Sequence, residues 1–577
     1  MRTFNRALAA AGLIALAAPV IGAQDRPESI LPPGFGEPAP AATSTPRATA
    51  TPLPGDPPGA VVQPLPTDTA SPTPTPTATP TPIDPATLAQ YEMPVFARRS
   101  LAVVGTGGEI EADAFGRADG RYLEALMRRT AAPLPSRWLS IALRRLLVSR
   151  LDTPRGLHGA DFAAERAWLL LRMGESVAAR AVVQGVDNAN YTPKLYQVAA
   201  NAWLATGDPA GMCPVADAAR AAVGGAAWTM AQPICAALAG DAPRARTLFA
   251  AARRSRAATG VDLLLAQKVM GAAGGRQAVT IEWDGVDRLT AWRFGLATAT
   301  GVALPDDFYA AAAPQATYWR ALAPGVPLAN RIAAAEAAAG QGVLSNLALV
   351  DLYGAVAGDE DAASGPSAAA QDLRTAYTGA DADGRLAALR QLWGTTPAWP
   401  RLVLTARAAA RQPVRQVADA DPLVASMLTA GLDRSAARWA ASVPAGGDAW
   451  AMIALADPAA RRLSYADVQG YTGGDARRRL FFAGLAGLGR LARDDVERTA
   501  EALAVPIGAT NSWTRALDRA VADEQPGTVL LLAAIGMQTP GWRGVPPAAL
   551  YRIVAGLRAV GLDGEARMIA AEAIARG

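Results

Sequence analysis

Residues 167–183 read AWLLLRMGESVAARAVV. An apolar helical segment ends at Gly174, and a second apolar segment follows at once. Glycine supplies the left-handed backbone conformation that ends a helix, and the acidic Glu175 suits the positive end of the next helix. The stretch therefore predicts two antiparallel helices joined by a glycine turn.

The same pattern recurs along the chain at a fixed interval. Gly207 and Gly240 follow Gly174 in steps of 33 residues, and in both copies an aspartate comes after the glycine. These two copies are NAWLATGDPAGMCPVADAA (201–219) and ICAALAGDAPRARTLFAAA (234–252). A period of 33 residues with a helix, a glycine turn and a helix is the pattern of an αα-hairpin repeat.

Two later segments share this pattern. They are SMLTAGLDRSAARWAA (426–441), around Gly431, and GLRAVGLDGEARMIAAEAIA (556–575), around Gly561. In four of the five units the fifth residue after the glycine is alanine, and only the Gly207 unit has Met212 there. The alanines are Ala179, Ala245, Ala436 and Ala566. A small side chain at this place lets neighbouring helices approach closely.

These five units resemble tetratricopeptide-like repeats, although the longer residue signature of that family is matched only in part. The resemblance covers about half of residues 160–577. It implies an all-α fold, a stacked αα-hairpin solenoid with concave binding surfaces. The alternative is an irregular all-helical bundle in which the glycines fall at equal intervals by coincidence.

The segment 358–370, GDEDAASGPSAAA, is polar, small and interrupted by glycine and proline. It is the predicted break between an N-terminal helical-repeat array at 91–357 and a C-terminal array at 371–577. The helical pattern also weakens near VTIEW (279–283), where a few β-branched residues are compatible with a short strand. No segment after residue 95 is apolar enough to span a membrane.

The first 23 residues have the layout of a secretory signal peptide. Arg2 and Arg6 form a basic start, an apolar run extends over 7–18, and 21–23 (IGA) is a small-residue cleavage site. The sequence therefore predicts export to the periplasm or cell envelope of a Gram-negative-like bacterium. The alternative is an uncleaved segment that anchors the chain in the inner membrane, with membrane contact only in that case.

Residues 24–90 are dominated by proline, threonine and alanine, as in PTPTPTATPTP at 72–82. Too few large apolar groups are present to offset the entropy of ordering, and proline favours the extended polyproline II conformation. The sequence predicts a disordered but extended linker. It would be a free tail after cleavage of the leader, or a long spacer if the leader stays in the membrane.

Cys213 and Cys235 are the two cysteines of the chain, and export places them where thiols oxidise. Cys213 is expected to begin the second helix of the Gly207 hairpin, and Cys235 falls toward the end of the following helix. If the chain turns near 224–225, the two cysteines lie at similar distances from the turn on antiparallel helices. This arrangement predicts a structural disulfide, with two buried thiols as the alternative.

The residues of the chain exclude several classes of catalytic or cofactor-binding site. His158 is the single histidine, so zinc sites that need two histidines are impossible, and a surface or capping role suits this residue. The segment VVGTGGEIEAD (103–113) has Ile110 where a dinucleotide fingerprint has its third glycine. The sequence predicts no cofactor, no metal site and no catalytic residue. A net charge of +4 over 577 residues also gives little reason to expect nucleic-acid binding.

Export combined with an α-solenoid is similar to the layout of soluble lytic transglycosylases, whose catalytic domain carries a Glu-Ser pair. Glu175-Ser176 is the one match, but it lies in a repeat turn, and the Gly-Leu-Met-Gln-like stretch expected downstream is missing. The pair is therefore not assigned a catalytic role. The acidic pairs at 306–307 and 494–495 precede apolar helical runs and are expected at helix N-termini.

Residues 136–150, SRWLSIALRRLLVSR, form a basic amphipathic segment. The segment suits the first packing helix of the helical body, with its arginines exposed. The alternative is a helix that lies on an anionic membrane surface.

The sequence as a whole favours an exported, non-enzymatic scaffold or adaptor that binds a protein or an envelope polymer. One alternative is a hydrolase or lyase-related protein that acts on envelope polymer with a pair of carboxylates. Another is a membrane-tethered assembly factor. A concave apolar or aromatic groove would favour a peptide or protein partner.

Overall fold

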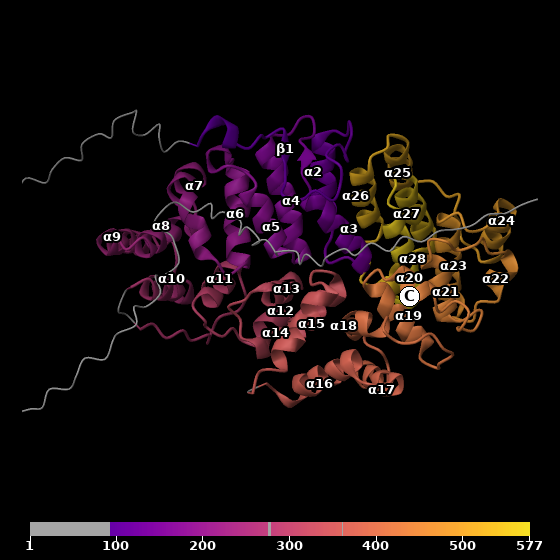
Figure 1. The fold of residues 1–577 in the computed structure, drawn as a ribbon. Helices are drawn as coiled ribbons and strands as arrows, with labels where there is room; N and C mark the ends of the chain where they lie inside the picture. Colours follow the sequence, from indigo (N-terminus) through magenta and orange to yellow (C-terminus); the bar gives the residue numbers. More distant parts are fainter. Residues whose placement is uncertain (1–92, 275–277, 361) are drawn as a thin grey trace, which may run out of the picture. The chain divides into compact units, whose positions relative to one another are not determined.

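The computed structural model describes residues 93–274, 278–360 and 362–577, and within them the chain is mostly helical (Figure 1). These residues contain 27 α-helices and one two-stranded antiparallel sheet. The predicted leader at 1–23 and the predicted linker, up to residue 92, lie outside the described residues. None of the helices described is long and apolar enough to cross a bilayer.

The N-terminal part of the described chain is a succession of helices with a short sheet beside them. Its elements are η1 (Val95–Ala97), β1 (Val103–Val104), α2 (Gly120–Arg129), α3 (Arg137–Val148), β2 (Leu151–Asp152), α4 (Gly159–Met173), α5 (Ser176–Gln184), η2 (Asn188–Asn190), α6 (Pro193–Ala205), η3 (Pro209–Val215), α7 (Ala216–Val223), α8 (Ala226–Leu238), α9 (Ala242–Arg254) and α10 (Gly260–Ala272). The strands pair Val103 with Asp152 and Val104 with Leu151. The segment 103–113 therefore enters a two-residue ladder rather than a nucleotide-binding unit.

The middle of the chain continues with helices and an irregular connection before them. Its helices are α11 (Ala291–Ala299), α12 (Asp306–Ala311), α13 (Gln315–Leu322), α14 (Leu328–Gln341), α15 (Asn346–Val356), α16 (Ser364–Thr378), α17 (Ala382–Trp393) and α18 (Trp399–Ala409). The sequence allowed a short strand at residues 279–283, but these residues form no strand in the structure. Helix α16 begins inside the predicted break at 358–370 and contacts α15, and the division into two arrays stays a prediction.

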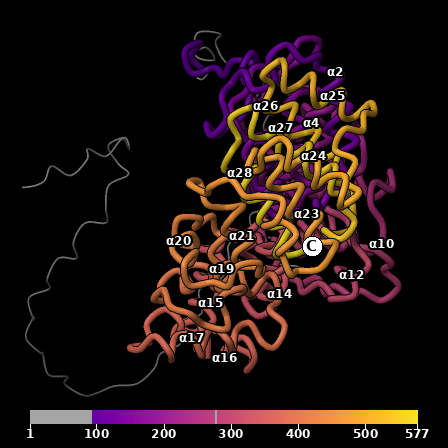
Figure 2. The backbone as a smooth tube through the Cα atoms, turned by 90° about the vertical axis from the view of Figure 1, so that its right-hand side faces the viewer, coloured from indigo at the N-terminus to yellow at the C-terminus, as the bar shows by residue number. Residues whose placement is uncertain are grey.

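The last part of the chain is again made of consecutive helices. They are α19 (Ala420–Thr429), α20 (Asp433–Ala437), α21 (Asp448–Ala456), α22 (Tyr465–Gln469), α23 (Asp475–Gly487), α24 (Arg493–Ala502), α25 (Ser512–Ala522), α26 (Pro526–Gly536), η4 (Trp542–Gly544), α27 (Pro547–Ala559) and α28 (Asp563–Arg576). Helix α28 packs against α3 as well as against its neighbours α21, α23 and α27, and Figures 1 and 2 show these segments converging. One continuous apolar core extends from Val104 to Ile574.

The five glycines predicted at turns all lie between consecutive helical elements and all have positive φ. The φ values are 87° at Gly174, 69° at Gly207, 80° at Gly240, 70° at Gly431 and 84° at Gly561. At each turn the glycine N–H donates to the carbonyl three residues earlier, and the next N–H donates to the carbonyl five residues before it. These bonds satisfy the last carbonyls of the helix, which is the role that a helix-ending glycine performs.

The turn at Gly207 differs from the other four because it leads into a 3₁₀ segment. The chain passes through η3 before the α-helix α7 begins at Ala216. Pro209 and Pro214 lie in η3, and proline has no N–H to donate to an α-helical hydrogen bond. The expected second α-helix of this hairpin is therefore delayed by the seven residues of η3.

The four alanines at the fifth position after the turn glycines are at most 2% exposed. Met212, which takes this place in the Gly207 unit, is 1% exposed. The position is thus an interior one in every unit. The fold is helical as predicted, and its description as a tetratricopeptide-like solenoid remains a proposal.

The basic amphipathic segment at 136–150 forms α3, which packs inside the helical body. Its leucines are buried and even Arg137 is 3% exposed. Arg137 Nη1 donates to the Ala339 carbonyl at 2.6 Å, and Arg144 Nη1 donates to the Gly342 carbonyl at 2.7 Å. Both carbonyls lie at the C-terminal end of α14, where cations are favoured. The prediction of a packing helix is confirmed, but the expected exposed arginine face is wrong, because Arg137 is buried and Arg144 and Arg145 are partly buried.

Candidate functional site

A groove with a volume of about 600 Å³ lies between α9 and α10, beside the end of α8. We refer to it as the α9–α10 groove. Its lining residues are Ala237, Gly240, Ala242, Ala245, Arg246, Phe249, Ala250, Arg253, Gln267, Met270, Gly271, Ala273 and Gly274. The larger apolar side chains on its wall are therefore those of Phe249 and Met270, set among alanines and glycines.

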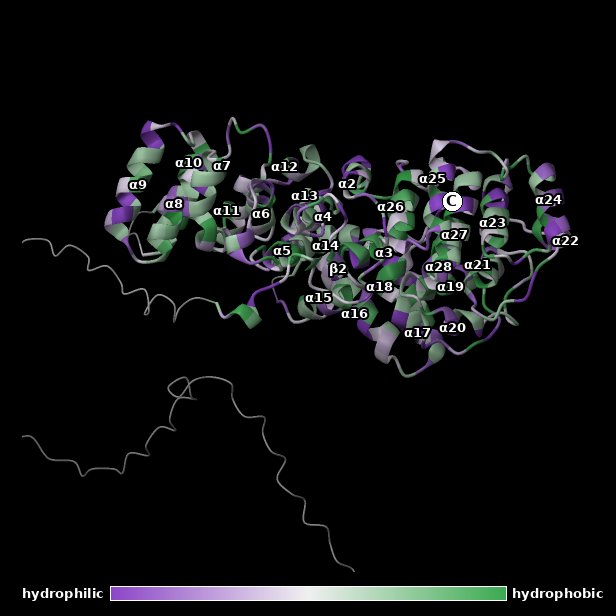
Figure 3. Cartoon of the chain, turned by 90° about the horizontal axis from the view of Figure 1, so that it is seen from above, coloured by the Kyte–Doolittle hydropathy of each residue, from purple (hydrophilic) through white to green (hydrophobic). Residues whose placement is uncertain are grey.

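Helix α9 buries little of its surface. Ala245 and Ala252 are its two buried residues among thirteen, whereas α4 buries twelve residues of fifteen. Both α9 and α10 pack against α8, and Phe249 on α9 remains partly exposed at the groove. Hydrophilic residues are prominent along α9 in Figure 3. A helix of this kind presents both polar and apolar groups to a ligand.

The charge of the groove has one sign. Among the described residues, no acidic side chain lines it, and the charged lining residues are Arg246 and Arg253. Neither arginine forms a side-chain hydrogen bond or ion pair with any residue in the described part of the chain. They are seven residues apart on one helix face, which corresponds to about 10.5 Å along the helix axis. The groove therefore presents two unpaired guanidinium groups beside an apolar wall.

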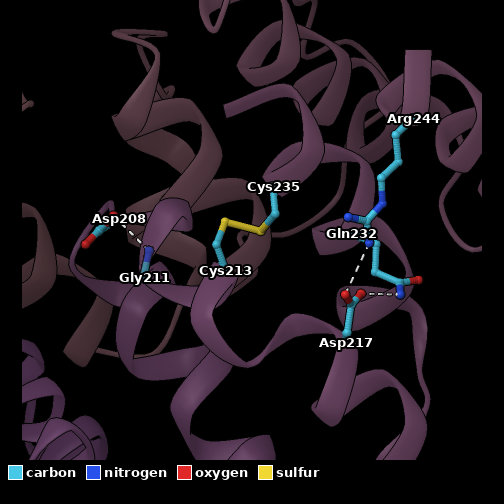
Figure 4. Close-up of a disulfide and its surroundings, with 7 residues drawn as sticks. All are labelled: Asp208, Gly211, Cys213, Asp217, Gln232, Cys235 and Arg244. Carbon is cyan, nitrogen blue, oxygen red and sulfur yellow. Dashed lines mark hydrogen bonds and ion pairs between the residues drawn. A yellow bond between two sulfur atoms is a disulfide. The ribbon is translucent and has the colours of Figure 1, made fainter. Parts of the chain in front are cut away.

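The helices that form this groove are linked to their neighbours next to it (Figure 4). The sulfur atoms of Cys213 and Cys235 lie 2.06 Å apart, which links η3 to α8. Asp217 on α7 accepts hydrogen bonds from Gln232 of α8 at 2.8 Å and from Arg244 of α9 at 3.2 Å. The wall of the groove is thus held by one covalent bond and one polar cluster.

The predicted cysteine pair is at bonding distance, but one detail of its setting differs from the prediction. Cys213 lies in the 3₁₀ segment η3 rather than at the start of an α-helix. Cys235 lies toward the end of α8, and the turn at 224–225 separates the two antiparallel segments as expected.

Gly240, one of the predicted turn glycines, lies at the groove. A Cβ atom added at this position would have no atom within 4 Å, whereas a Cβ at Gly174 would lie 2.4 Å from Tyr318 Cδ2. The turn at Gly240 is therefore open to its surroundings, and the turn at Gly174 is covered by α13.

Other residues identified in the sequence lie outside this groove. His158 is exposed and directly precedes α4. The acidic pair at 306–307 lies in the first turn of α12, and the pair at 494–495 lies in the first turn of α24. These placements fit the surface and helix-terminal roles that the sequence predicts for them.

Glu175 is buried, with 4% of its surface exposed, and so is the adjacent Ser176. Arg144 Nη1 lies 3.1 Å from Glu175 Oε1. Burial raises the pKa of Glu175 to about 7, and the nearby Arg144 guanidinium opposes this rise. Glu175 lies in the buried turn between α4 and α5, where the sequence predicts a turn.

A second cavity, of about 620 Å³, has an acidic lining that includes Asp262, Glu282, Asp284 and Asp287. Arg293 occupies the same cavity and donates to both carboxylate oxygens of Asp262, at 2.9 and 3.2 Å. Within residues 93–274, 278–360 and 362–577, no group of three histidine, cysteine or acidic side chains is placed to hold a metal ion.

Of the groove residues, the sequence singled out Gly240 and Ala245, as parts of a repeat turn, but it did not identify Arg246, Phe249, Arg253 or Met270. One available signal was the run APRARTLFAAARR (242–254), which contains four arginines and no acidic residue. This run does not predict that α10 lies beside α9 or that a groove remains between the two helices.

Comparison with known proteins finds no match to a family model, to a curated protein or to a solved structure.

Proposed function

We propose that the protein is a non-enzymatic helical scaffold or adaptor whose α9–α10 groove binds an acidic amphipathic helix of a protein partner. The observation that carries this proposal is the combination of an apolar groove wall with Arg246 and Arg253, two cations seven residues apart that have no side-chain partner among the described residues. Helices that dock in grooves use apolar anchors at positions i, i+3, i+4 and i+7. Acidic residues one heptad apart on such a helix would match the spacing of the two arginines.

The apolar and charged parts of the groove would contribute differently to binding. Burial of apolar side chains of the partner against Phe249 and Met270 would supply most of the affinity, at roughly 25 cal/mol per Å² of apolar surface removed from water. Exposed ion pairs contribute about 0.2–1 kcal/mol each, so the arginines would chiefly select the charge and register of the partner.

We place this function in the periplasm or cell envelope. The layout of the predicted leader supports export, and a disulfide between Cys213 and Cys235 suits an oxidising compartment. In this setting the proline- and threonine-rich linker would separate the helical body from the N-terminus of the chain.

The proposal is tested by fluorescence anisotropy with three labelled helical peptides and the full-length protein. The first carries leucines at helical spacing and glutamates seven residues apart, the second has the same residues in scrambled order, and the third has lysines in place of the glutamates. Saturable binding of the first peptide, at least tenfold tighter than that of the other two, is expected. Equal binding of all three peptides, or no binding of the first, would overturn the proposal.

Anionic vesicles provide a further comparison, because a cationic helix with apolar residues can also lie on a membrane surface. A concave groove fits a single helix better than a flat bilayer surface. Binding to vesicles with no binding of the acidic peptide would therefore contradict the partner-helix proposal.

A further inference from the structure

A separate cavity, of about 770 Å³, lies between the start of α2 and the helices α25 and α26. We refer to it as the α2–α25 cleft. It shares no lining residue with the α9–α10 groove. Any ligand in the cleft is therefore held by a different set of helices from those of the proposed partner site.

The cleft is built by contacts between residues that are distant in the sequence. The Gly527 N–H, in the first turn of α26, donates to the Ala114 carbonyl at 2.8 Å. A Cβ atom on Gly527 would lie 2.7 Å from Phe115 Cε1, so glycine permits this close approach. The loop before α2 is thus seated on the N-terminal end of α26.

One wall of the cleft is lined by α25, which places Arg515 and Arg519 there, four residues apart. Tyr122, on α2, lines the same cavity as Arg519. Burial raises the pKa of Tyr122, and the Arg519 guanidinium opposes this rise. Arg117, from the loop before α2, also lines the cavity.

The three arginines of the cleft have unused hydrogen-bonding capacity. Among the described residues, the side chains of Arg117, Arg515 and Arg519 form no hydrogen bond or ion pair. Each guanidinium presents a planar set of donors that matches a carboxylate. The cleft therefore offers up to three places where a carboxylate would be paired.

A fourth group in the cleft also lacks a partner. Thr528, in the first turn of α26, is 2% exposed, and its hydroxyl forms no hydrogen bond in the described part of the chain. A buried hydroxyl without a partner is costly, and a ligand oxygen or a bound water would satisfy it. The positive end of α26 adds to the preference for an anionic group there.

Two carboxylates limit which anions suit this site. Asp119 caps α2 by accepting a hydrogen bond from the Tyr122 N–H at 3.1 Å, and Asp523 is exposed at the end of α25. Asp523 forms no side-chain hydrogen bond or ion pair with a described residue. A ligand that carries one ammonium group beside its carboxylates could pair with Asp523, whereas a polyphosphate or a nucleic-acid backbone has no cationic group for this aspartate.

We propose that the α2–α25 cleft binds a short acidic peptide, with its carboxylates on Arg117, Arg515 and Arg519 and its ammonium group on Asp523. The recognised chemistry is that of a molecule with more carboxylates than ammonium groups and a length of a few residues, which suits the size of the cavity. This binding activity is independent of the α9–α10 groove and of its partner.

The experiment is calorimetric titration of the full-length protein with the tripeptide Ala-Glu-Glu, which carries three carboxylates and one ammonium group. Saturable binding is expected at low salt, with a weaker affinity at 0.5 M salt because the contacts are ionic. Arg515→Gln and Arg519→Gln should each weaken binding at least tenfold. Arg479→Gln, at an exposed arginine of α23 outside the cleft, should leave the affinity unchanged.

Three results would overturn this assignment. The first is that the tripeptide does not bind. The second is that the Arg515→Gln, Arg519→Gln and Arg479→Gln proteins bind the tripeptide with equal affinity. The third is that inorganic phosphate binds as tightly as the tripeptide does. N-acetylation of the tripeptide should weaken binding severalfold, and Asp523→Asn should weaken binding of the free tripeptide but not of the acetylated one. Arg246→Glu in the α9–α10 groove should leave tripeptide binding intact, which separates a failure of this assignment from a failure of the proposed partner site.

Discussion

The Glu572 carboxylate, in the last helix of the chain, accepts a hydrogen bond from the Ser136 hydroxyl at 2.7 Å, and the two residues are 436 positions apart. Ser136 is the N-cap of α3, so a carboxylate from α28 lies at the positive end of α3. The same carboxylate accepts from the Arg137 N–H at 2.9 Å and from the Trp138 N–H at 3.1 Å. The chain end is thereby joined to one of its first helices by a buried anion site.

Removal of this carboxylate should destabilise the whole helical body. In Glu572→Ala, the N-terminal N–H groups of α3 lose their acceptor, and Arg576 loses a partner 2.7 Å away. Because the Glu572 side chain is 1% exposed, the expected loss is about 3–5 kcal/mol of unfolding free energy, as for other broken buried pairs. Urea denaturation followed by circular dichroism measures it.

Glu497 provides the matched control for this variant. It pairs with Arg493 on α24, but its side chain is 68% exposed. Glu497→Ala should change the unfolding free energy by less than about 0.5 kcal/mol. Equal losses of unfolding free energy in the two variants would show that the buried contact to α3 stabilises the protein no more than an exposed ion pair does.

Two turn glycines with nearly equal φ values should respond differently to alanine. A Cβ at Gly174 would lie 2.4 Å from Tyr318 Cδ2, whereas a Cβ at Gly561 would meet no atom within 4 Å. Both substitutions carry the left-handed backbone cost of about 1–2 kcal/mol. Gly174→Ala should lose at least about 1 kcal/mol more than Gly561→Ala, because Tyr318 has to move. Thermal or urea unfolding of the two variants tests this order, and a larger loss at Gly561 would refute it.

The buried carboxyl of Glu175 should make stability depend on pH. Burial raises its pKa from 4.5 to about 7, so in this interval the folded state binds more protons than the unfolded state. Stability therefore falls as the pH rises from 4.5 toward 7. Glu175→Gln removes this dependence, and relative to the wild type it should gain about 2 kcal/mol between pH 5 and pH 7. Urea titrations at the two pH values measure the difference, with Glu497→Gln as the exposed control, and a constant difference would contradict the prediction.

Loss of the disulfide should weaken both stability and groove binding. Replacement of Cys213 and Cys235 by serine opens a cross-link between residues 22 positions apart. The expected cost is about 3 kcal/mol in the chain-entropy model. Because α8 forms part of the groove, binding of the acidic helical peptide should also weaken. Reduction of the wild type by dithiothreitol should reproduce both effects, and it should have no effect on the double serine variant.

Much of the local structure can be predicted from the sequence because its determinants lie within a few residues of one another. The turn at Gly174 needs only a residue that can adopt the left-handed conformation after an apolar helix. Both the glycine and the apolar segment before it are evident in the sequence. Gly342 performs the same role at the end of α14, with the Val343 N–H donating to the Ala338 carbonyl at 2.9 Å, yet it falls outside the 33-residue spacing. At Glu524, φ is 52° and no glycine marks the turn at all.

The arrangement of distant segments could not be read from the sequence. The contact of Glu572 with Ser136 joins α28 to α3. The sequence of neither helix predicts that it packs against the other. The α9–α10 groove is a gap between two helices that pack on a third, so it depends on crossing angles rather than on residue identity. The arginines of α9 can be read from the sequence, but the absence of an acidic side chain beside Arg246 and Arg253 among the described residues depends on how the helices pack.

The most direct test of the proposed function is a charge reversal at the groove, with binding of the acidic helical peptide as the readout. Arg246→Glu with Arg253→Glu should weaken binding at least tenfold and should favour the lysine peptide instead. Arg254→Glu, on the same helix but outside the groove lining, should leave the preference for the acidic peptide unchanged. If the double reversal binds the acidic peptide as well as the Arg254→Glu protein does, the groove is not the partner site.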